Sequence, residues 1–152
     1  MADTRPDPLA AFLRQPEPNL LLFGFLLNLP WELLQIPFFA GMSSLAHWDG
    51  VMLCTRAAAG DALISLVAFW MVASWRRSRT WLARTGWREC VAFVAPGLVA
   101  TIAFEWWAIR VGRWAYAESM PAMPWLQTGL LPLLQWLLIP PLLLWIVRRQ
   151  IR

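Results

Sequence analysis

The chain has 152 residues, 59% of them hydrophobic, and a mean hydropathy of +0.51. This apolar share is above that of soluble domains, so the composition excludes an ordinary soluble globular protein and indicates an integral membrane protein. The net charge of +4 does not indicate nucleic-acid binding, because the basic residues flank apolar segments and form no separate patch.

The first eighteen residues precede the first long apolar segment. They contain four prolines and charges of both signs, but no apolar stretch followed by a small-residue cleavage site. They therefore do not have the pattern of a secretory signal peptide. We expect the first apolar segment to act as an uncleaved membrane anchor.

Four apolar windows are long enough to cross a bilayer as helices of about 20 residues. They comprise residues 19–40, 57–75, 90–109 and 125–147. The sequence predicts an all-α, polytopic membrane protein in which residues 1–152 form one integral membrane domain. We expect an antiparallel bundle of four transmembrane helices, with the first and fourth helices kinked by proline.

The arginines predict the orientation of this bundle, because they supply all thirteen basic residues of the chain. Ten of them precede the first window, lie in the loop 76–89 or follow the fourth window: Arg5, Arg14, Arg76, Arg77, Arg79, Arg84, Arg88, Arg148, Arg149 and Arg152. The opposite side has only Arg56, Arg110 and Arg113. By the positive-inside rule, both termini and the loop 76–89 are expected in the cytoplasm.

The first window contains the polar stretch NLPWELLQIPFF, residues 28–39. Asn28, Glu32 and Gln35 follow the spacing i, i+4, i+7 and so share one helix face, beside Trp31. A carboxylate in hydrocarbon costs about 3 kcal/mol on insertion scales, so it normally faces a bundle interior and has a partner. This face is therefore predicted to point into the protein.

Each of the other windows carries one strongly polar side chain at a similar depth. These residues are Asp61, Glu105 and Gln135. Counted from the cytoplasmic helix ends, Glu32, Asp61 and Glu105 lie about 20–23 Å deep and Gln135 about 18 Å deep. We predict that the four side chains form one polar layer in the outer half of the membrane, with the three carboxyl groups as candidate catalytic residues.

The residues after the third window extend this candidate site. Arg110 and Arg113 follow Glu105 by one or two turns and are expected to be its counter-charges, and Trp106 adjoins it. The segment 113–124 contains Tyr116, the only tyrosine in the chain, and two further prolines. We expect it to form a structured cap over the polar layer, with Tyr116 among the ligand-binding residues.

Prolines in the windows offer a structural explanation for the amides. Pro30 and Pro37 in the first window, like Pro96 and the three prolines of the fourth window, each remove a helix N–H and free a carbonyl. In a dry medium such carbonyls need other donors. Asn28, Gln35 and Gln135 could serve only this purpose, and this alternative stays open.

Several chemistries lack the residues that they require. A single histidine, His47, falls in an expected outer connection, so the sequence indicates no metal site and no histidine pair for haem. Cys54 and Cys90 are expected at opposite ends of the bundle and unpaired. No phosphate-binding loop or nucleophile elbow is present, and the sequence assigns no cofactor.

Three short motifs carry a resemblance to a group of known proteins. They are NLPWELLQIPFF at 28–39, GDALISL at 60–66 and GRWAY at 112–116. With them the chain resembles small uncharacterised bacterial four-helix membrane proteins, which implies a multi-pass protein of the bacterial inner membrane but no activity. LPWELLQIPFF also partly resembles the acidic motif of membrane-embedded carotenoid cyclases, but Leu33 stands where a second acid is required, so no catalytic residue is carried over.

Three functions remain compatible with these residues, and the sequence leaves open whether the protein is an enzyme. The favoured one is binding or acid/base processing of a lipid-soluble ligand, for example an isoprenoid, with Glu32 or Glu105 as proton donor and Asp61 or a glutamine orienting the ligand. The second is a subunit or assembly factor of a larger membrane complex, or a homo-oligomer. The third is a small proton- or cation-coupled carrier. The lipid bilayer is a partner in all three, and nucleic acid in none.

Overall fold

The computed structural model describes residues 8–123, 125–126 and 128–152. Arg5 and Pro124, which we counted in the N-terminal flank and at the end of the cap, lie outside these residues. The described chain is mostly helical, with four helices long and apolar enough to cross a membrane. The prediction of four long apolar helices is therefore confirmed.

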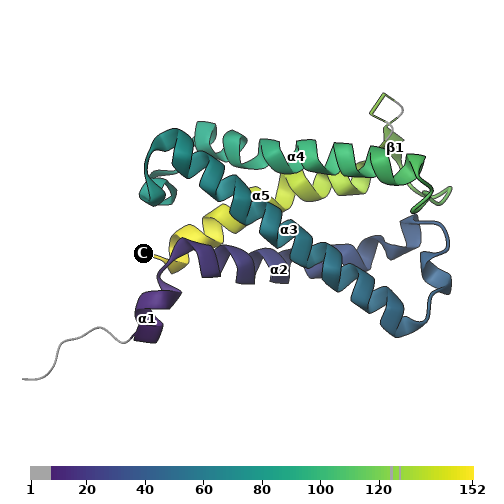
Figure 1. Ribbon diagram of the computed structural model, residues 1–152, viewed down its shortest axis with the longest axis horizontal. Coiled ribbons are helices and arrows are strands. Elements are labelled where there is room, and N and C mark those ends of the chain that lie inside the picture. Colours follow the sequence, from purple (N-terminus) through teal and green to yellow (C-terminus); the bar gives the residue numbers. More distant parts are fainter. Residues whose placement is uncertain (1–7, 124, 127) are drawn as a thin grey trace, which may run out of the picture.

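The four helices alternate in direction and lie side by side (Figure 1). They are α2 (Pro16–Gln35), α3 (His47–Arg76), α4 (Trp87–Arg110) and α5 (Leu130–Gln150). Each helix packs against two others, in the order α2, α3, α4, α5 and back to α2. A short helix, α1 (Pro8–Leu13), precedes α2.

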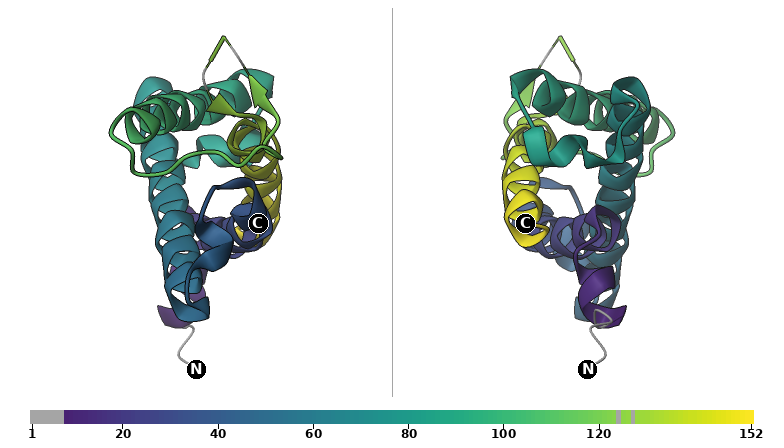
Figure 2. Two further views of the ribbon diagram at one scale, coloured as in Figure 1. Left: turned by 90° about the vertical axis from the view of Figure 1, so that its right-hand side faces the viewer. Right: turned by 90° about the vertical axis from the view of Figure 1, so that its left-hand side faces the viewer.

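The connections gather at the two ends of the helices. At one end lie α1, the end of α5 and the 3-10 helix η3 (Arg79–Arg84) between α3 and α4 (Figure 1). At the other end lie η1 (Ile36–Phe38), η2 (Met42–Ser44) and the segment between α4 and α5 (Figure 2). That segment includes a hairpin of β1 (Ala122–Met123) and β2 (Thr128–Gly129), in which Ala122 pairs with Gly129 and Met123 with Thr128.

Three helix boundaries differ from the expected windows by five residues or more: α2 ends at Gln35 and not at residue 40, α3 begins earlier and α5 begins later. α3 begins at His47, ten residues before window 57–75, so His47, Cys54 and Arg56 are helical and do not lie in a connection. Its 30 residues span about 45 Å, more than the hydrocarbon core of about 30 Å. A hydropathy window detects only the apolar part of such a helix, because His47, Asp49 and Arg56 lower the average.

The fourth helix begins at Leu130, five residues later than the window beginning at 125. Pro132 thus falls in the first turn of α5, where a missing N–H leaves no intrahelical bond unmade. Pro37 lies beyond the end of α2, in η1. Pro30, Pro96, Pro140 and Pro141 do lie inside helices.

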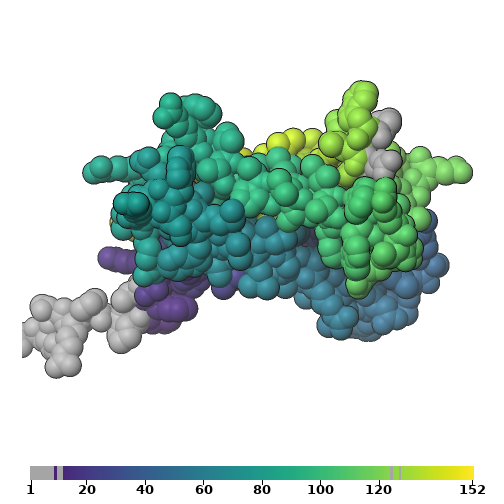
Figure 3. All heavy atoms as spheres, turned by 45° about the horizontal axis from the view of Figure 1, so that its top comes forward, coloured from purple at the N-terminus to yellow at the C-terminus, as the bar shows by residue number. Residues whose placement is uncertain are grey.

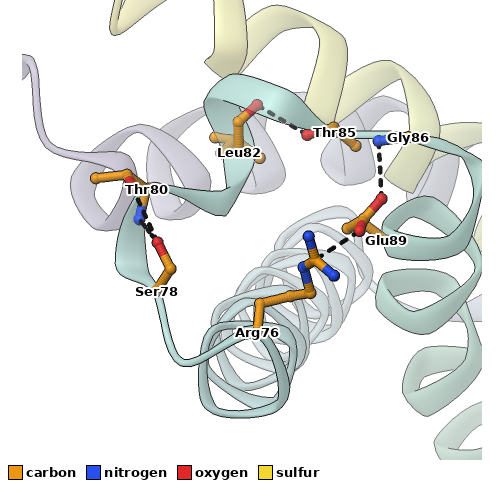
Figure 4. Close-up of polar contacts among 7 residues, drawn as sticks. All are labelled: Arg76, Ser78, Thr80, Leu82, Thr85, Gly86 and Glu89. Atoms are coloured by element: carbon orange, nitrogen blue, oxygen red, sulfur yellow. Dashed lines mark hydrogen bonds and ion pairs between the residues drawn. The ribbon is translucent and has the colours of Figure 1, made fainter.

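The connection between α3 and α4 is closed by polar contacts (Figure 4). Glu89 accepts a hydrogen bond from the Gly86 backbone N–H at 2.9 Å, and its other carboxylate oxygen lies 3.4 Å from Nε of Arg76. This arrangement ties the start of α4 to the end of α3. η3 then folds back so that Trp81 and Leu82 are buried against Phe69 and Phe93 in the main apolar core.

The side chains of α3 and α4 form a continuous surface between η3 and the α4–α5 segment (Figure 3). Beneath it, α4 and α5 meet closely where Gly97 faces the buried Trp136 ring. A Cβ placed on Gly97 would lie 1.8 Å from Cε3 of Trp136. Any larger residue at this position must displace the indole.

We expect Gly97→Ala to lower the free energy of unfolding by about 1–3 kcal/mol, because overpacking a well-filled core has about this cost. Gly60→Ala is the matched control, since a Cβ on this helical glycine meets nothing within 4 Å. That change should be neutral, or stabilising by up to about 1 kcal/mol through helix propensity. Denaturant unfolding in detergent, followed by circular dichroism, measures the stability of both variants. If Gly97→Ala were as stable as Gly60→Ala, the close contact between Gly97 and Trp136 would be contradicted.

Candidate functional site

The side-chain amide of Gln135 joins three helices. Its Nε2 donates to Oδ1 of Asn28 at 2.8 Å, to Oε1 of Glu32 at 3.0 Å and to Oδ2 of Asp61 at 2.8 Å. We call these four residues the Gln135 cluster. Gln135 comes from α5, Asn28 and Glu32 from α2, and Asp61 from α3, so the predicted meeting of these polar side chains is present in the structure.

The carboxyl groups of Glu32 and Asp61 lie close together, because Oε1 of Glu32 and Oδ2 of Asp61 both accept from Nε2 of Gln135, at 3.0 and 2.8 Å. Two ionised carboxylates at this place would repel each other and offer only acceptors, so one proton shared between them is favoured. The amide of Gln135 has two hydrogens for three acceptors, and a protonated carboxyl reduces this deficit. The pair can therefore hold and exchange one proton.

Close packing of α2 on α3 sets the position of this cluster. Gly24, one turn before Asn28, faces Ala62, and an added Cβ would lie 3.4 Å from the Ala62 Cα. Asn28 is anchored at the same place, because its Nδ2 donates to the Gly24 carbonyl at 2.8 Å. The α2 face carrying Asn28 and Glu32 is therefore held against Asp61, the neighbour of Ala62.

The amides do not bind the carbonyls that proline frees. Pro30 would free the carbonyl of Leu26, four residues earlier, whereas Asn28 donates to Gly24 and Gln135 donates only to side chains. The alternative in which these two amides only repair broken backbone is therefore not what the structure shows. Their main partners are side chains of the cluster.

Two buried polar atoms beside Glu32 have no hydrogen-bond partner among the described residues. They are Nε1 of Trp31, a donor, and Oε1 of Gln35, an acceptor. These two residues lie one turn apart on the same face of α2, and Glu32 directly follows Trp31 in the sequence. A buried donor or acceptor without a partner costs about 1–3 kcal/mol, so such atoms are uncommon unless a ligand or water completes them.

Glu105 lies in a second polar group, outside the Gln135 cluster. Its Oε2 accepts a hydrogen bond from the Tyr116 hydroxyl and another from Nε1 of Trp114 at 3.3 Å. The Tyr116 oxygen in turn accepts from the Gly129 N–H at 2.7 Å. Glu32 is near enough to interact with Glu105 electrostatically, but the two carboxyl groups have separate partners.

The expected counter-charges of Glu105 lie elsewhere. The guanidinium groups of Arg110 and Arg113 are exposed and stack over Trp106 at 3.9 Å and over Trp107 at 5.5 Å. Trp106 is 43% exposed, and its ring carries the Arg110 guanidinium. The partners of Glu105 are therefore Tyr116 and Trp114 from the α4–α5 segment, and not the two arginines that the sequence suggested.

This segment covers the end of the helices next to the two polar groups. Backbone N–H groups of Ala40 and Ala117 donate to the carbonyls of Ala115 and Phe38 at 2.8 and 3.0 Å. The Phe39 ring contacts the rings of both Trp114 and Tyr116. The cap expected from the sequence is thus joined to the α2–α3 connection, and Tyr116 links it to α4.

Tyr116 supports a prediction about pH. Burial, and then the hydrogen bond to Glu105, raise the pKa of Tyr116 above its ordinary value of about 10. Since the folded pKa is the higher one, this contribution to stability is complete below pH of about 10 and is lost as the pH rises through the folded pKa. Phenolate absorbance reports Tyr116 alone, because the chain has no other tyrosine.

We therefore expect the phenolate signal of the folded protein to appear only well above pH of about 10, and that of the unfolded protein to appear near pH of about 10. Tyr116→Phe supplies the baseline. Glu105→Gln should shift the folded midpoint downward, since it removes one of the two main causes. A folded midpoint equal to the unfolded one would contradict the burial of the hydroxyl.

Among the described residues, no group of three or more His, Cys, Asp and Glu side chains is placed to hold a metal ion. The chemistry that the site offers is therefore hydrogen bonding and proton exchange by carboxyl groups, with unpaired donor and acceptor atoms beside them. Cys54 contributes only a 3.5 Å contact from its sulfur to the Glu32 carbonyl.

No protein-family model, curated protein or solved structure matches the chain. The resemblance to small bacterial membrane proteins is therefore supported only for the four-helix architecture, and the bacterial origin that it implied has no support.

Proposed function

We propose that the protein is an integral membrane protein whose Gln135 cluster binds the polar end of a lipid-soluble ligand. One observation carries the proposal: Trp31 Nε1 and Gln35 Oε1, on residues one turn apart on α2 and near Glu32, are buried with no partner among the described residues. A free donor and a free acceptor on neighbouring side chains match a ligand group that both accepts and donates, such as a hydroxyl. Isoprenoid alcohols and related lipids have this chemistry.

The membrane placement rests on the four apolar helices and on the arrangement of their ends. The loop 77–86 and the end of α5 lie together, beside α1, at the arginine-rich end (Figure 1). We place this end in the cytoplasm by the positive-inside rule, which makes the chain an antiparallel four-span bundle with both termini inside. Its assignment to a bacterial inner membrane is part of the proposal and rests on the motif resemblance alone.

Acid/base processing of the ligand would use the carboxyl pair. Glu32 is the better proton donor, because its carboxyl group lies beside that of Asp61 and because Trp31 and Gln35, which carry the unpaired atoms, are its neighbours on α2. Glu105 already accepts two hydrogen bonds from Tyr116 and Trp114. In this proposal Asp61 and Gln135 orient Glu32, and Glu105 holds the cap in place.

Organic extraction of the purified chain, followed by mass spectrometry, tests the proposal. We expect a lipid-soluble compound bearing a hydroxyl or carbonyl group, recovered in a fixed ratio to protein and enriched over the membrane from which the protein was taken. Recovery of bulk phospholipid alone would contradict it. If a second protein co-purifies in a fixed ratio to the chain and no lipid-soluble ligand is extracted, the subunit or assembly-factor alternative is favoured instead.

The neighbouring carboxyl groups of Glu32 and Asp61 also favour a second candidate, a proton-coupled carrier, since such a pair can share and exchange a proton where α2, α3 and α5 meet. Such a carrier would show proton flux in proteoliposomes that Asp61→Asn abolishes. Flux equal to that of empty liposomes would remove this candidate.

A further inference from the structure

A basic hollow lies at the opposite end of the molecule from the cap. It has a volume of about 380 Å³ and is lined by Trp145, Arg148, Arg149 and Arg152. Trp145, Arg148 and Arg149 follow the spacing i, i+3, i+4 and share one face of the last turns of α5, and Arg152 follows the end of this helix. The volume is within the range of small-molecule sites.

The arginines of the hollow have no acidic partner among the described residues, unlike Arg76 and Arg79 at the same end. Arg79 lies 2.6 Å from Glu17, and Arg76 lies 3.4 Å from Glu89. No such ion pair is formed by Arg148, Arg149 or Arg152 within the described part of the chain. The hollow therefore has three positive charges that no carboxylate neutralises.

The arginines of the hollow are also held in place and not fully bonded. Nε of Arg148 is buried and makes no hydrogen bond to any described residue. Arg149 stacks on the Trp145 ring at 5.0 Å, which places one guanidinium beside an apolar surface. Arginine presents planar N–H groups that match phosphate oxygens in bidentate contacts.

We propose that this hollow binds the phosphate group of an anionic phospholipid. The phosphodiester would lie between Arg148, Arg149 and Arg152. The half-exposed Trp145 would contact the glycerol and the upper acyl chain, at the depth where indole rings meet headgroups. The site is independent of the ligand proposed for the Gln135 cluster.

A lipid fits this position better than free phosphate for a structural reason. The hollow lies at the end of an apolar helix, where exposed Leu138, Leu142 and Trp145 offer a surface for acyl chains. Free phosphate would use only the arginines. Phospholipid binding and free-phosphate binding can therefore be distinguished by the contribution of the acyl chains to the affinity.

Native mass spectrometry of the full chain in detergent tests the proposal, with phosphatidylglycerol and phosphatidylcholine of equal acyl chains as probes. We expect phosphatidylglycerol to bind at least about tenfold more tightly. The triple variant Arg148→Gln, Arg149→Gln, Arg152→Gln should remove this preference. Should it fail to fold, the single variants Arg148→Gln and Arg152→Gln should each weaken binding about fivefold.

The matched control removes three arginines from the same end but outside the hollow: Arg14→Gln, Arg84→Gln, Arg88→Gln. This variant should keep the preference, as should Glu32→Gln. Equal binding of the two lipids to wild-type protein, or an equal loss in the control variant, would overturn the proposal. Displacement of the lipid by inorganic phosphate at the same concentration would overturn it in favour of a free-phosphate site.

Discussion

Gln135→Leu is expected to lower the free energy of unfolding by about 2 kcal/mol. The change removes hydrogen bonds to Asn28, Glu32 and Asp61, and an interhelical hydrogen bond in a membrane protein contributes about 0.6 kcal/mol on average. The loss involves contacts of α5 with both α2 and α3, so it should appear as a lower midpoint in denaturant unfolding in detergent micelles.

Gln150→Leu is the control for this change, because Gln150 is exposed at the end of the same helix. Its unfolding midpoint should equal that of the wild type. If Gln135→Leu were equally stable, Gln135 would not hold the three helices together, and the geometry of the cluster would have no energetic role.

Asp61→Asn is expected to abolish the infrared signal of a protonated carboxyl in the Gln135 cluster. An asparagine can still accept from Gln135 and can donate to Glu32 through its amide, so no proton is needed between the two side chains. The fold should persist, with a change in unfolding free energy within about 1 kcal/mol. Infrared spectra of wild type and variant, taken at neutral pH, measure the carboxyl band.

Glu32→Gln should remove the same band, because the two carboxyl groups share one proton and both of them are needed to hold it. Asp49→Asn should leave it in place, since Asp49 is exposed in the first turn of α3. A wild-type spectrum without the band, or a band that survives both Asp61→Asn and Glu32→Gln, would contradict the pair.

Helical periodicity predicted the α2 side of the site well. The spacing of Asn28 and Glu32 placed them on one face, and depth along the helices brought Asp61 and Gln135 to the same level. Depth alone does not say toward which neighbour a side chain points. Glu105 has the expected depth, yet its α4 position directs it to Tyr116 and Trp114.

The partners of Glu105 could not be derived from charge. Arg110 and Arg113 are near it in sequence, but their guanidinium groups stay exposed on tryptophan rings. Tyr116 reaches it only because the α4–α5 segment folds back over the helix ends and bonds to residues 38 and 40. Such a return depends on loop geometry that hydropathy does not encode.

Hydropathy also misjudged two features at the ends of the helices. Trp81 lies between the second and third windows, outside every apolar segment, yet η3 buries it beside Phe69 and Phe93. His47 was expected in a connection, but α3 continues through it, because a helix can extend beyond the apolar region into water.

The cluster combines a structural feature with a functional one, and the two can be separated. A purely structural role requires only the hydrogen bonds that Gln135 donates, and a glutamine in place of Glu32 would still accept one of these hydrogen bonds. A binding site would also use the carboxyl group of Glu32 together with the unpaired atoms of Trp31 and Gln35. Natural sites often retain such unfavourable groups at a cost in stability.

The most direct test is therefore the amount of extractable lipid-soluble ligand per chain in folded Glu32→Gln, measured by mass spectrometry beside wild type and Glu118→Gln. Glu118 is an exposed acid of the cap and serves as the control. We predict a loss of about tenfold or more in Glu32→Gln, with ligand retained in Glu118→Gln and with unfolding stability unchanged or higher. Equal ligand content in all three proteins would contradict a binding role for the Gln135 cluster.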